Sequence, residues 1–197
     1  MNLTKLVFYL FMVMIPAVPV AEAGALQSLL EQHPDYDQHD LIVVDISSQV
    51  LRWFHDGKLK RQYPVSTSRY GIGSKAGSNR TPLGLHYIRR KIGAGAESGT
   101  IFRARKSTGR KAGIEHRPIV TGDDYVASRI MWLSGLEAGK NRGKDVDSYS
   151  RYIYIHGTHE EGLIGQPASH GCIRMRNQDV IELFKNIRSR TLVRIQK

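Results

Sequence analysis

The chain has 197 residues, of which 41% are hydrophobic and 24% are charged, a balance typical of a globular protein and not of a disordered one. Its 29 Lys and Arg against 18 Asp and Glu give a formal net charge of +11, which favours an anionic partner such as nucleic acid, an acidic membrane surface or an acidic polymer. The single cysteine, Cys172, excludes an intrachain disulfide and any metal cage built from several cysteines.

The first 23 residues have the layout of a secretory signal peptide. Lys5 is followed by an apolar run over residues 6–15, and Ala21-Glu22-Ala23 supplies an A-x-A cleavage site. The run has 10 residues, about half of the ~20 that a membrane-spanning helix needs. We expect cleavage after this site and export from the cytoplasm, with no stable membrane insertion afterwards; an uncleaved anchor is the alternative. After export, the positive charge points to an extracytoplasmic anionic polymer instead of nucleic acid.

Strand patterns dominate the remaining residues, 24–197, which we expect to form one domain with its core over about 40–197. A short helix is predicted over residues 25–32. β-Branched and aromatic runs predict seven strands, at residues 41–46, 50–55, 59–65, 85–92, 129–133, 151–155 and 191–195. Asp56-Gly57 predicts a hairpin turn between the second and third of these strands.

One late helix is predicted from Asn177, as its N-cap, to about residue 188. Its buried side is expected to carry Val180, Ile181, Phe184 and Ile187. No regular alternation of strands and helices is visible, which argues against a parallel α/β fold. The sequence therefore predicts a mostly-β domain, a sandwich or open barrel, with a short N-terminal helix and one helix near the C-terminus.

Residues 89–111 hold much of the positive charge. They contain eight Lys or Arg residues and a single acid, Glu97, around a glycine-rich stretch at 93–99. A mobile, solvated loop is one interpretation. The other is a basic rim that draws an anionic substrate towards a cleft.

Most of the reactive side chains lie in one window, from Tyr152 to Met175. A cysteine nucleophile needs a nearby base, because a free thiol is only slightly ionised at neutral pH. His156 is the candidate base, since it stands at the end of a predicted strand. His170 precedes Cys172 by two residues, and this tight spacing suits a loop whose backbone N–H groups form an oxyanion hole. Gly171 would supply the backbone freedom for that loop.

The window resembles the catalytic motif of the L,D-transpeptidase family (the YkuD-type domain), which is H-G-x, a gap, and then S-H-G-C-I-R-M/L. The matching residues here are His156-Gly157-Thr158 and the run from Ser169 to Met175. Residues 42–65 and the turn at 81–84 look like early elements of the family. The resemblance therefore covers most of residues 40–197.

This resemblance implies a periplasmic enzyme that acts on peptidoglycan stem peptides. Cys172 would attack the carbonyl of the third residue of a tetrapeptide stem, expel the terminal D-Ala and pass the acyl group from a thioester to an amine, as in a 3→3 crosslink. His156 carries over as general acid/base, and His170 and Gly171 as catalytic-loop and oxyanion elements. No metal or other cofactor is required, because the thiolate is the nucleophile and backbone amides stabilise the charge.

Three polar neighbours of the motif have roles that the sequence leaves less defined. Arg174 either binds a substrate carboxylate through its guanidinium fork or pairs with an acid of the protein. Ser169 is expected to hold the loop by bonding to its backbone. His159 is expected to be a solvated loop histidine, because the neighbouring Glu160 is expected to be exposed.

Several alternatives stay open at this point. The same acyl-enzyme could be hydrolytic, as in an L,D-carboxypeptidase or amidase. A zinc-dependent wall hydrolase could use His156, His159, His170 and Cys172 as ligands. A non-catalytic domain could simply bind the anionic wall. The sequence does not indicate the acceptor, the oligomeric state or which segment covers the site.

Overall fold

A computed structural model of the chain describes residues 20–197, so the predicted signal peptide lies almost wholly outside the described residues. Helix α1 (Val20–Glu31) begins earlier than the helix predicted over 25–32, and the predicted cleavage site lies in its first turn. No helix in the described part of the chain is both long and apolar enough to cross a membrane.

Within residues 20–197, ten strands share one mixed sheet, which confirms the predicted mostly-β class. The main path of the sheet runs β3-β2-β1-β10-β4-β7-β5-β6, and β8 pairs with β7 and β9. The strands are β1 (Asp40–Asp45), β2 (Val50–His55), β3 (Lys58–Pro64), β4 (Gly84–Ile92), β5 (Thr100–Arg103), β6 (Lys106–Lys111), β7 (Val126–Gly135), β8 (Tyr154–Gly157), β9 (Ile173–Met175) and β10 (Leu192–Gln196). Helix α2 (Asn177–Asn186) and two short 3₁₀ turns, η1 (Lys144–Val146) and η2 (Glu161–Leu163), complete the described elements.

Two parallel pairs join segments that are far apart in the sequence. The last strand, β10, lies beside β1, with Leu41 opposite Leu192. Strand β8 lies beside β9, with His156 opposite Arg174. The other strand pairs are antiparallel, and the β2–β3 pair turns at Asp56-Gly57 as predicted, with positive φ angles of 48° and 70°. The β8–β9 pair is the one that assembles the candidate site.

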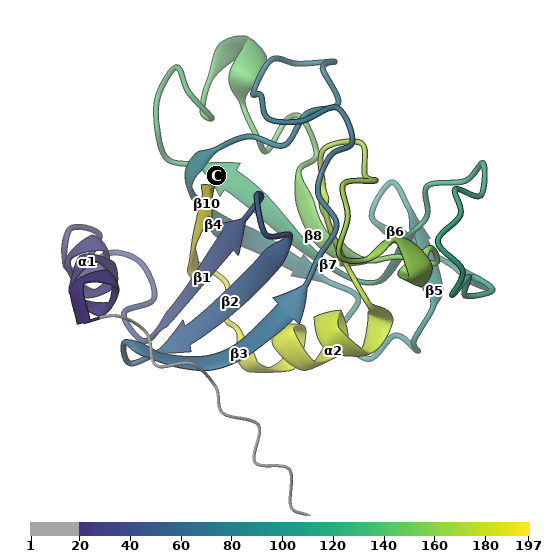
Figure 1. The fold of residues 1–197 in the computed structure, drawn as a ribbon, viewed down its shortest axis with the longest axis horizontal. Coiled ribbons are helices and arrows are strands. Elements are labelled where there is room, and N and C mark those ends of the chain that lie inside the picture. The colour runs from purple at the N-terminus through teal and green to yellow at the C-terminus, as the bar shows by residue number, and fades with distance from the viewer. Residues whose placement is uncertain (1–19) are drawn as a thin grey trace, which may run out of the picture.

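The sheet is covered on both faces. Helix α2 packs on one face of β7 and β8, and α1 covers the opposite side of β1, β10 and β4 at the far end of the molecule (Figure 1). Strand β7 is buried along almost its whole length, so both of its faces meet packed side chains. Met131 and Leu133 face the α2 core, whereas Ile130 and Trp132 face a smaller cluster that includes Tyr154 and contacts Cys172.

Three predicted details need correction. The strand predicted at 151–155 begins only at Tyr154, because Tyr152 has a φ of 58° that does not fit a strand. The N-cap of α2 is Arg176; Asn177 instead donates to Thr158 O and Glu161 Oε1. In α2, Leu183 is buried and Ile181 is only partly buried.

The basic segment 89–111 is a loop only at residues 93–99 and at the turn 104–105. It contains the end of β4 and the β5–β6 hairpin, and the residues of β6 are exposed throughout. Figure 1 shows this hairpin at the opposite end of the sheet from α1. The sequence pattern missed β6 because its residues are charged, polar or glycine. It missed β5 because the apolar part of that strand is only Ile101 and Phe102, and pairing with β7 fixes it.

Candidate active site

Cys172 stands at the end of a loop, immediately before β9, and is half-buried. Its Sγ lies 3.3 Å from Tyr152 O, to which the thiol donates, and 3.4 Å from Tyr154 N, which donates to the sulfur. Burial raises the pKa of Cys172 to about 12, and the Tyr154 N–H only partly opposes this effect. The resting side chain is therefore a thiol and not a thiolate.

His156 lies on the same side of the sheet as Cys172. Strand alternation places Ile155 in the α2 core, and it turns Tyr154 and His156 to the other face. The His156 Nδ1 lies 2.7 Å from Gly157 O, so this nitrogen carries the proton and Nε2 keeps a free lone pair. Burial lowers the pKa of His156 to about 4, which keeps the ring neutral at pH 7.

No hydrogen bond joins the His156 ring to Cys172 in the described part of the chain. The sequence predicts that the imidazole takes the thiol proton or stabilises the thiolate. In the resting structure, however, the two side chains do not form an ion pair. Instead, the two neutral side chains belong to adjacent segments: His156 lies in β8 opposite Arg174, and Cys172 directly precedes β9, two residues before Arg174. Rotation of the thiol away from Tyr152 O would be needed to bring them together.

Gly157, directly after His156, is required mainly by close packing and less by a chain turn. A Cβ at this position would lie 2.6 Å from Asn177 Oδ1 and 2.8 Å from Ala127 O. The absence of a side chain lets α2 and β7 approach the end of β8. This approach holds the Gly157 carbonyl in place, and that carbonyl sets the tautomer of His156.

The loop before Cys172 is held by its own polar groups. Ser169 Oγ donates to Cys172 O at 2.6 Å and accepts the Gly171 N–H at 3.2 Å. Gly171 has a φ of 120°, which L side chains rarely adopt. Thr81 Oγ1 donates to Gly171 O and ties the loop to the segment before β4. Since the Gly171 N–H is already bonded, it is not a free oxyanion donor here.

His170 points into a chain of charged groups. Its Nδ1 lies 2.6 Å from Asp124 Oδ2, and its Nε2 lies 2.8 Å from Arg69 Nη2. Because arginine can only donate, Nε2 is the acceptor and Nδ1 carries the proton to Asp124. This arrangement orients His170 at the rim of the site, where 36% of its side chain is exposed.

Arg174 is almost completely buried, with 1% of its side chain exposed. It donates to Glu160 Oε2 at 2.7 Å and to Asp124 Oδ1 at 2.6 Å. The sequence left two roles open for Arg174, binding a substrate carboxylate or pairing with an acid of the protein. The structure shows the ion pairs with acids of the protein. Its guanidinium presents no free face to a substrate carboxylate.

The two acids that hold Arg174 were not singled out by sequence reasoning. Burial alone would raise the pKa of Asp124, but Arg174, His156 and His170 lower it below its usual value. Burial likewise opposes ionisation of Glu160, but Thr121 hydrogen bonds and Arg174 lower its pKa. Glu160 was expected to be exposed and is buried. One feature of the sequence could have indicated these acids: an arginine on a buried strand needs acidic partners.

His159 is also buried, contrary to the expected solvated loop position. Its Nε2 lies 2.7 Å from Thr121 Oγ1, and burial lowers its pKa. Among residues 20–197, no group of three or more His, Cys, Asp or Glu side chains is placed to hold a metal ion. The ligand set proposed for the zinc alternative is therefore not assembled by this fold.

The β5–β6 hairpin lies against the site. Arg105, at its turn, has Cζ 4.9 Å from the ring centroids of both Trp132 and Tyr152. A small pocket of about 210 Å³ lies under this turn, lined by Phe102, Ala104, Arg105, Val126, Ile130, Tyr152 and Tyr154. Of the two interpretations of the basic segment, this placement fits a basic rim beside a cleft.

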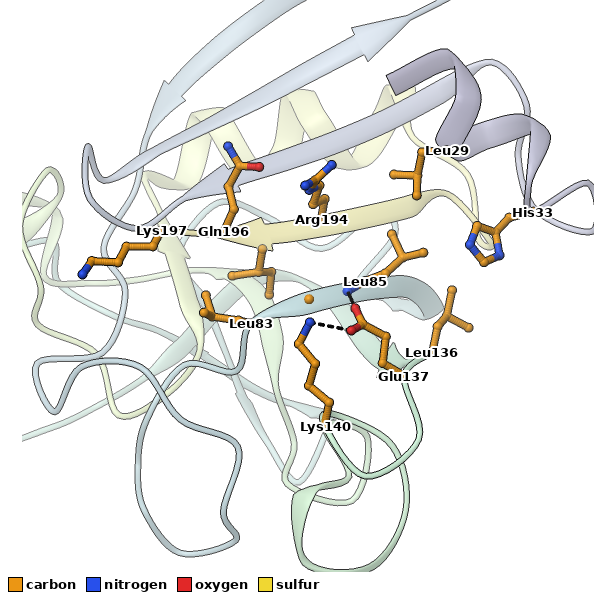
Figure 2. A pocket seen from close by; sticks show the side chains of 12 residues that line it. Leu29, His33, Leu83, Leu85, Leu136, Glu137, Lys140, Arg194, Gln196 and Lys197 are labelled. Carbon is orange, nitrogen blue, oxygen red and sulfur yellow. Dashed lines mark hydrogen bonds and ion pairs between the residues drawn. The ribbon is translucent and has the colours of Figure 1, made fainter. Parts of the chain in front are cut away.

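A second pocket, of about 530 Å³, lies at the other end of the sheet, between α1, β4 and β10 (Figure 2). Glu137 in this pocket accepts a hydrogen bond from the Leu85 N–H and forms an ion pair with Lys140. The remaining lining is mainly leucine and the aliphatic part of Arg194. Neither Cys172 nor His156 lines it.

Comparison with known proteins agrees with the motif. Residues 39–195 match the model of the L,D-transpeptidase catalytic domain, YkuD. The chain is 34% identical to YkuD of Bacillus subtilis over 82 residues, which are 39% of this chain and 44% of that protein. It is 49% identical to YkuD of Bacillus licheniformis over 49 residues, 24% of this chain and 30% of that one.

Among solved structures, an Enterococcus faecium L,D-transpeptidase carrying a cysteine-to-serine mutation has the same fold, with a TM-score of 0.51 and 18% identity. The match covers 83% of this chain and 52% of that one. The aligned segments thus span less than half of the two Bacillus relatives and about half of the solved chain.

Proposed function

The chain belongs to the L,D-transpeptidase catalytic-domain family, and from this membership we propose that it is a cysteine-dependent acyltransferase of peptidoglycan stem peptides in the periplasm. The observation that carries the proposal is the position of Cys172 Sγ, between Tyr152 O and Tyr154 N, on the same sheet face as the free Nε2 of His156. Export rests on the signal-like residues 1–23.

In the first half-reaction, the thiol leaves Tyr152 O and gives its proton to His156 Nε2 while sulfur bonds to the carbonyl carbon of the third stem residue. Because the pKa of Cys172 is raised to about 12 and that of His156 is lowered to about 4, we expect proton transfer to accompany the attack and not precede it. Concerted transfer avoids a buried thiolate–imidazolium pair in the free enzyme.

The tetrahedral oxyanion needs donors that are free in the resting structure. The Gly171 N–H is bonded to Ser169 Oγ, whereas the Cys172 N–H has no acceptor among residues 20–197. We assign the Cys172 N–H to the oxyanion. Collapse then breaks the C–N bond, and the amine of D-Ala leaves with the proton from His156, which forms the thioester.

In the second half-reaction, an acceptor amine attacks the thioester and gives a proton to His156. The sulfur leaves and recovers that proton, which restores the thiol. Water in place of the amine would give a tripeptide by the same steps. Burial around the sulfur, by Ile130, Trp132 and Tyr154, limits access by water and favours transfer over hydrolysis.

The test is incubation of the purified chain with disaccharide-tetrapeptide, followed by mass spectrometry of the products. We expect a crosslinked dimer and free D-Ala from the wild type, and neither product from Cys172→Ala. A tripeptide without dimer would assign the hydrolytic alternative. Product formation by Cys172→Ala would reject the cysteine mechanism altogether.

A further inference from the structure

Arg105 is a cation beside the nucleophile without an acidic partner. It sits at the second position of the β5–β6 turn, between Arg103 and Lys106, which are paired across the hairpin. Ala104 and Arg105 both have positive φ angles, 47° and 66°, as a two-residue hairpin turn requires. No salt bridge of Arg105 exists within residues 20–197, whereas Lys111 of the same hairpin pairs with Glu97.

The same two tyrosines contact both Arg105 and the sulfur. The guanidinium rests on the rings of Trp132 and Tyr152 and reaches Tyr154 Oη only at 3.5 Å. The Cys172 Sγ bonds to the backbone of Tyr152 and Tyr154. Of the five N–H donors on a guanidinium, at most one is engaged here, so the fork that matches a carboxylate is free.

Arg151 is the other cation near the sulfur, and two of its donors are bonded to backbone carbonyls. Its Nη2 donates to Arg80 O at 2.7 Å and its Nη1 to Gly73 O at 3.4 Å. Arg174 is sealed between Glu160 and Asp124. Arg105 differs from both: it rests on aromatic rings at the edge of the pocket, and its one hydrogen bond, to Tyr154 Oη, is long, so it can take an anion without giving up a bond to a backbone carbonyl or an acid.

We propose that Arg105 is a specificity-determining residue that binds the α-carboxylate of the terminal residue expelled from the donor stem. The identity of this carboxylate rests on the proposed function. Only the amide nitrogen and one α-carbon separate it from the carbonyl carbon that the sulfur attacks. Arg105 contacts the side chains of Tyr152 and Tyr154, whose backbone holds the sulfur, so one terminal residue of the stem can extend along these side chains from Cys172 to the guanidinium. The pocket of about 210 Å³ suits a single small residue.

The test compares stem tetrapeptides that end in a carboxylate or in a carboxamide, on a Cys172→Ala background so that binding is measured without turnover. Calorimetry is run with Arg105 intact, with Arg105→Gln and with Arg105→Lys. Lys106→Gln is the matched control, because it removes the same charge from the next, fully exposed residue. We expect the carboxylate peptide to bind at least tenfold more tightly than the carboxamide, and Arg105→Gln to remove this preference. Arg105→Lys should keep part of it, and Lys106→Gln all of it.

The outcomes separate this inference from the proposed function. Equal binding of the two peptides with Arg105 intact, or a preference that survives Arg105→Gln, overturns the carboxylate role while the function stands. Failure of both peptides to bind overturns the proposed function together with the inference. A merely structural role of Arg105 in the turn would weaken both peptides alike, and this result also overturns the proposal.

Discussion

The two faces of strands β7, β8 and β9 are equally buried but are built from different chemistry. On the α2 face, Met131, Ile155 and Ile173 are 0% exposed and meet only hydrocarbon. On the other face stand His156 and Arg174, with Cys172 directly before β9, each held by polar contacts. Close packing on the apolar face makes the strands rigid. That rigidity fixes the positions of the polar groups on the opposite face.

The largest expected effect is on the reactive face. His156→Gln should lower kcat/KM for tetrapeptide about a thousandfold, because it removes the acceptor of the thiol proton. It should cost little stability, since Gln can still donate to Gly157 O. Since the pKa of His156 is lowered to about 4, the wild-type acid limb of kcat/KM should lie near that pH and not near 6.5. Activity retained by His156→Gln would assign the base elsewhere.

On the apolar face the effect should appear in stability instead. Ile155→Ala should lower the free energy of unfolding by about 3 kcal/mol, through lost burial and the cavity that remains. Urea denaturation measures this change, and Ile119→Ala, at an exposed side chain, is the control. Activity per folded molecule should stay within about threefold of wild type. A large loss of activity in the folded variant would mean that the two faces are coupled.

The protonation state of the nucleophile gives a third contrast. With the pKa of Cys172 raised to about 12, alkylation by iodoacetamide should rise about tenfold per pH unit from pH 7 to 9, because the thiolate fraction rises in that proportion. The rate is followed by intact mass. A rate that stays constant over this range would reveal a preformed thiolate–imidazolium pair, in conflict with the contacts to Tyr152 and Tyr154.

The smallest effect is expected in the polar network itself. Glu160→Gln should lower the free energy of unfolding by about 2 kcal/mol, because Arg174 loses one buried partner but keeps Asp124. The folded-state pKa of Glu160 is lowered, so its contribution is present above the unfolded-state pKa and is lost as pH falls through the folded-state value.

The difference between wild type and Glu160→Gln should therefore be constant at pH 6–8 and shrink below about pH 4. Glu97→Gln is the control, since its ion pair with Lys111 is exposed and should contribute little. A pH-independent difference would mean that packing, and not charge, is what Glu160 supplies.

Much of the fold could be predicted from local patterns. The strands containing Val44, Phe54 and Ile88 were visible because β-branched and aromatic residues alternate or cluster over a strand length. The order around His156 and Cys172 indicated cysteine chemistry because a thiol requires a base and a tight loop. These features depend on residues close together in the sequence.

Other features depend on contacts between distant segments. The β5–β6 hairpin was not predicted as strands. The charged side chains of β6 face water, and β5 has only two apolar residues and is fixed by pairing with β7. His159 and Glu160 looked exposed, because the segment around Thr121 that buries them lies far away in the sequence.

The sequence by itself determined that the domain is mostly β and that Cys172 and His156 belong to one family motif. Only the tertiary structure decided that Arg174 is sealed between Glu160 and Asp124, that Cys172 lies between Tyr152 O and Tyr154 N, and that Arg105 rests on the rings of Trp132 and Tyr152. The reason is physical: local sequence sets backbone preference and side-chain alternation, whereas burial and pairing of charges depend on strands that meet only in the folded sheet.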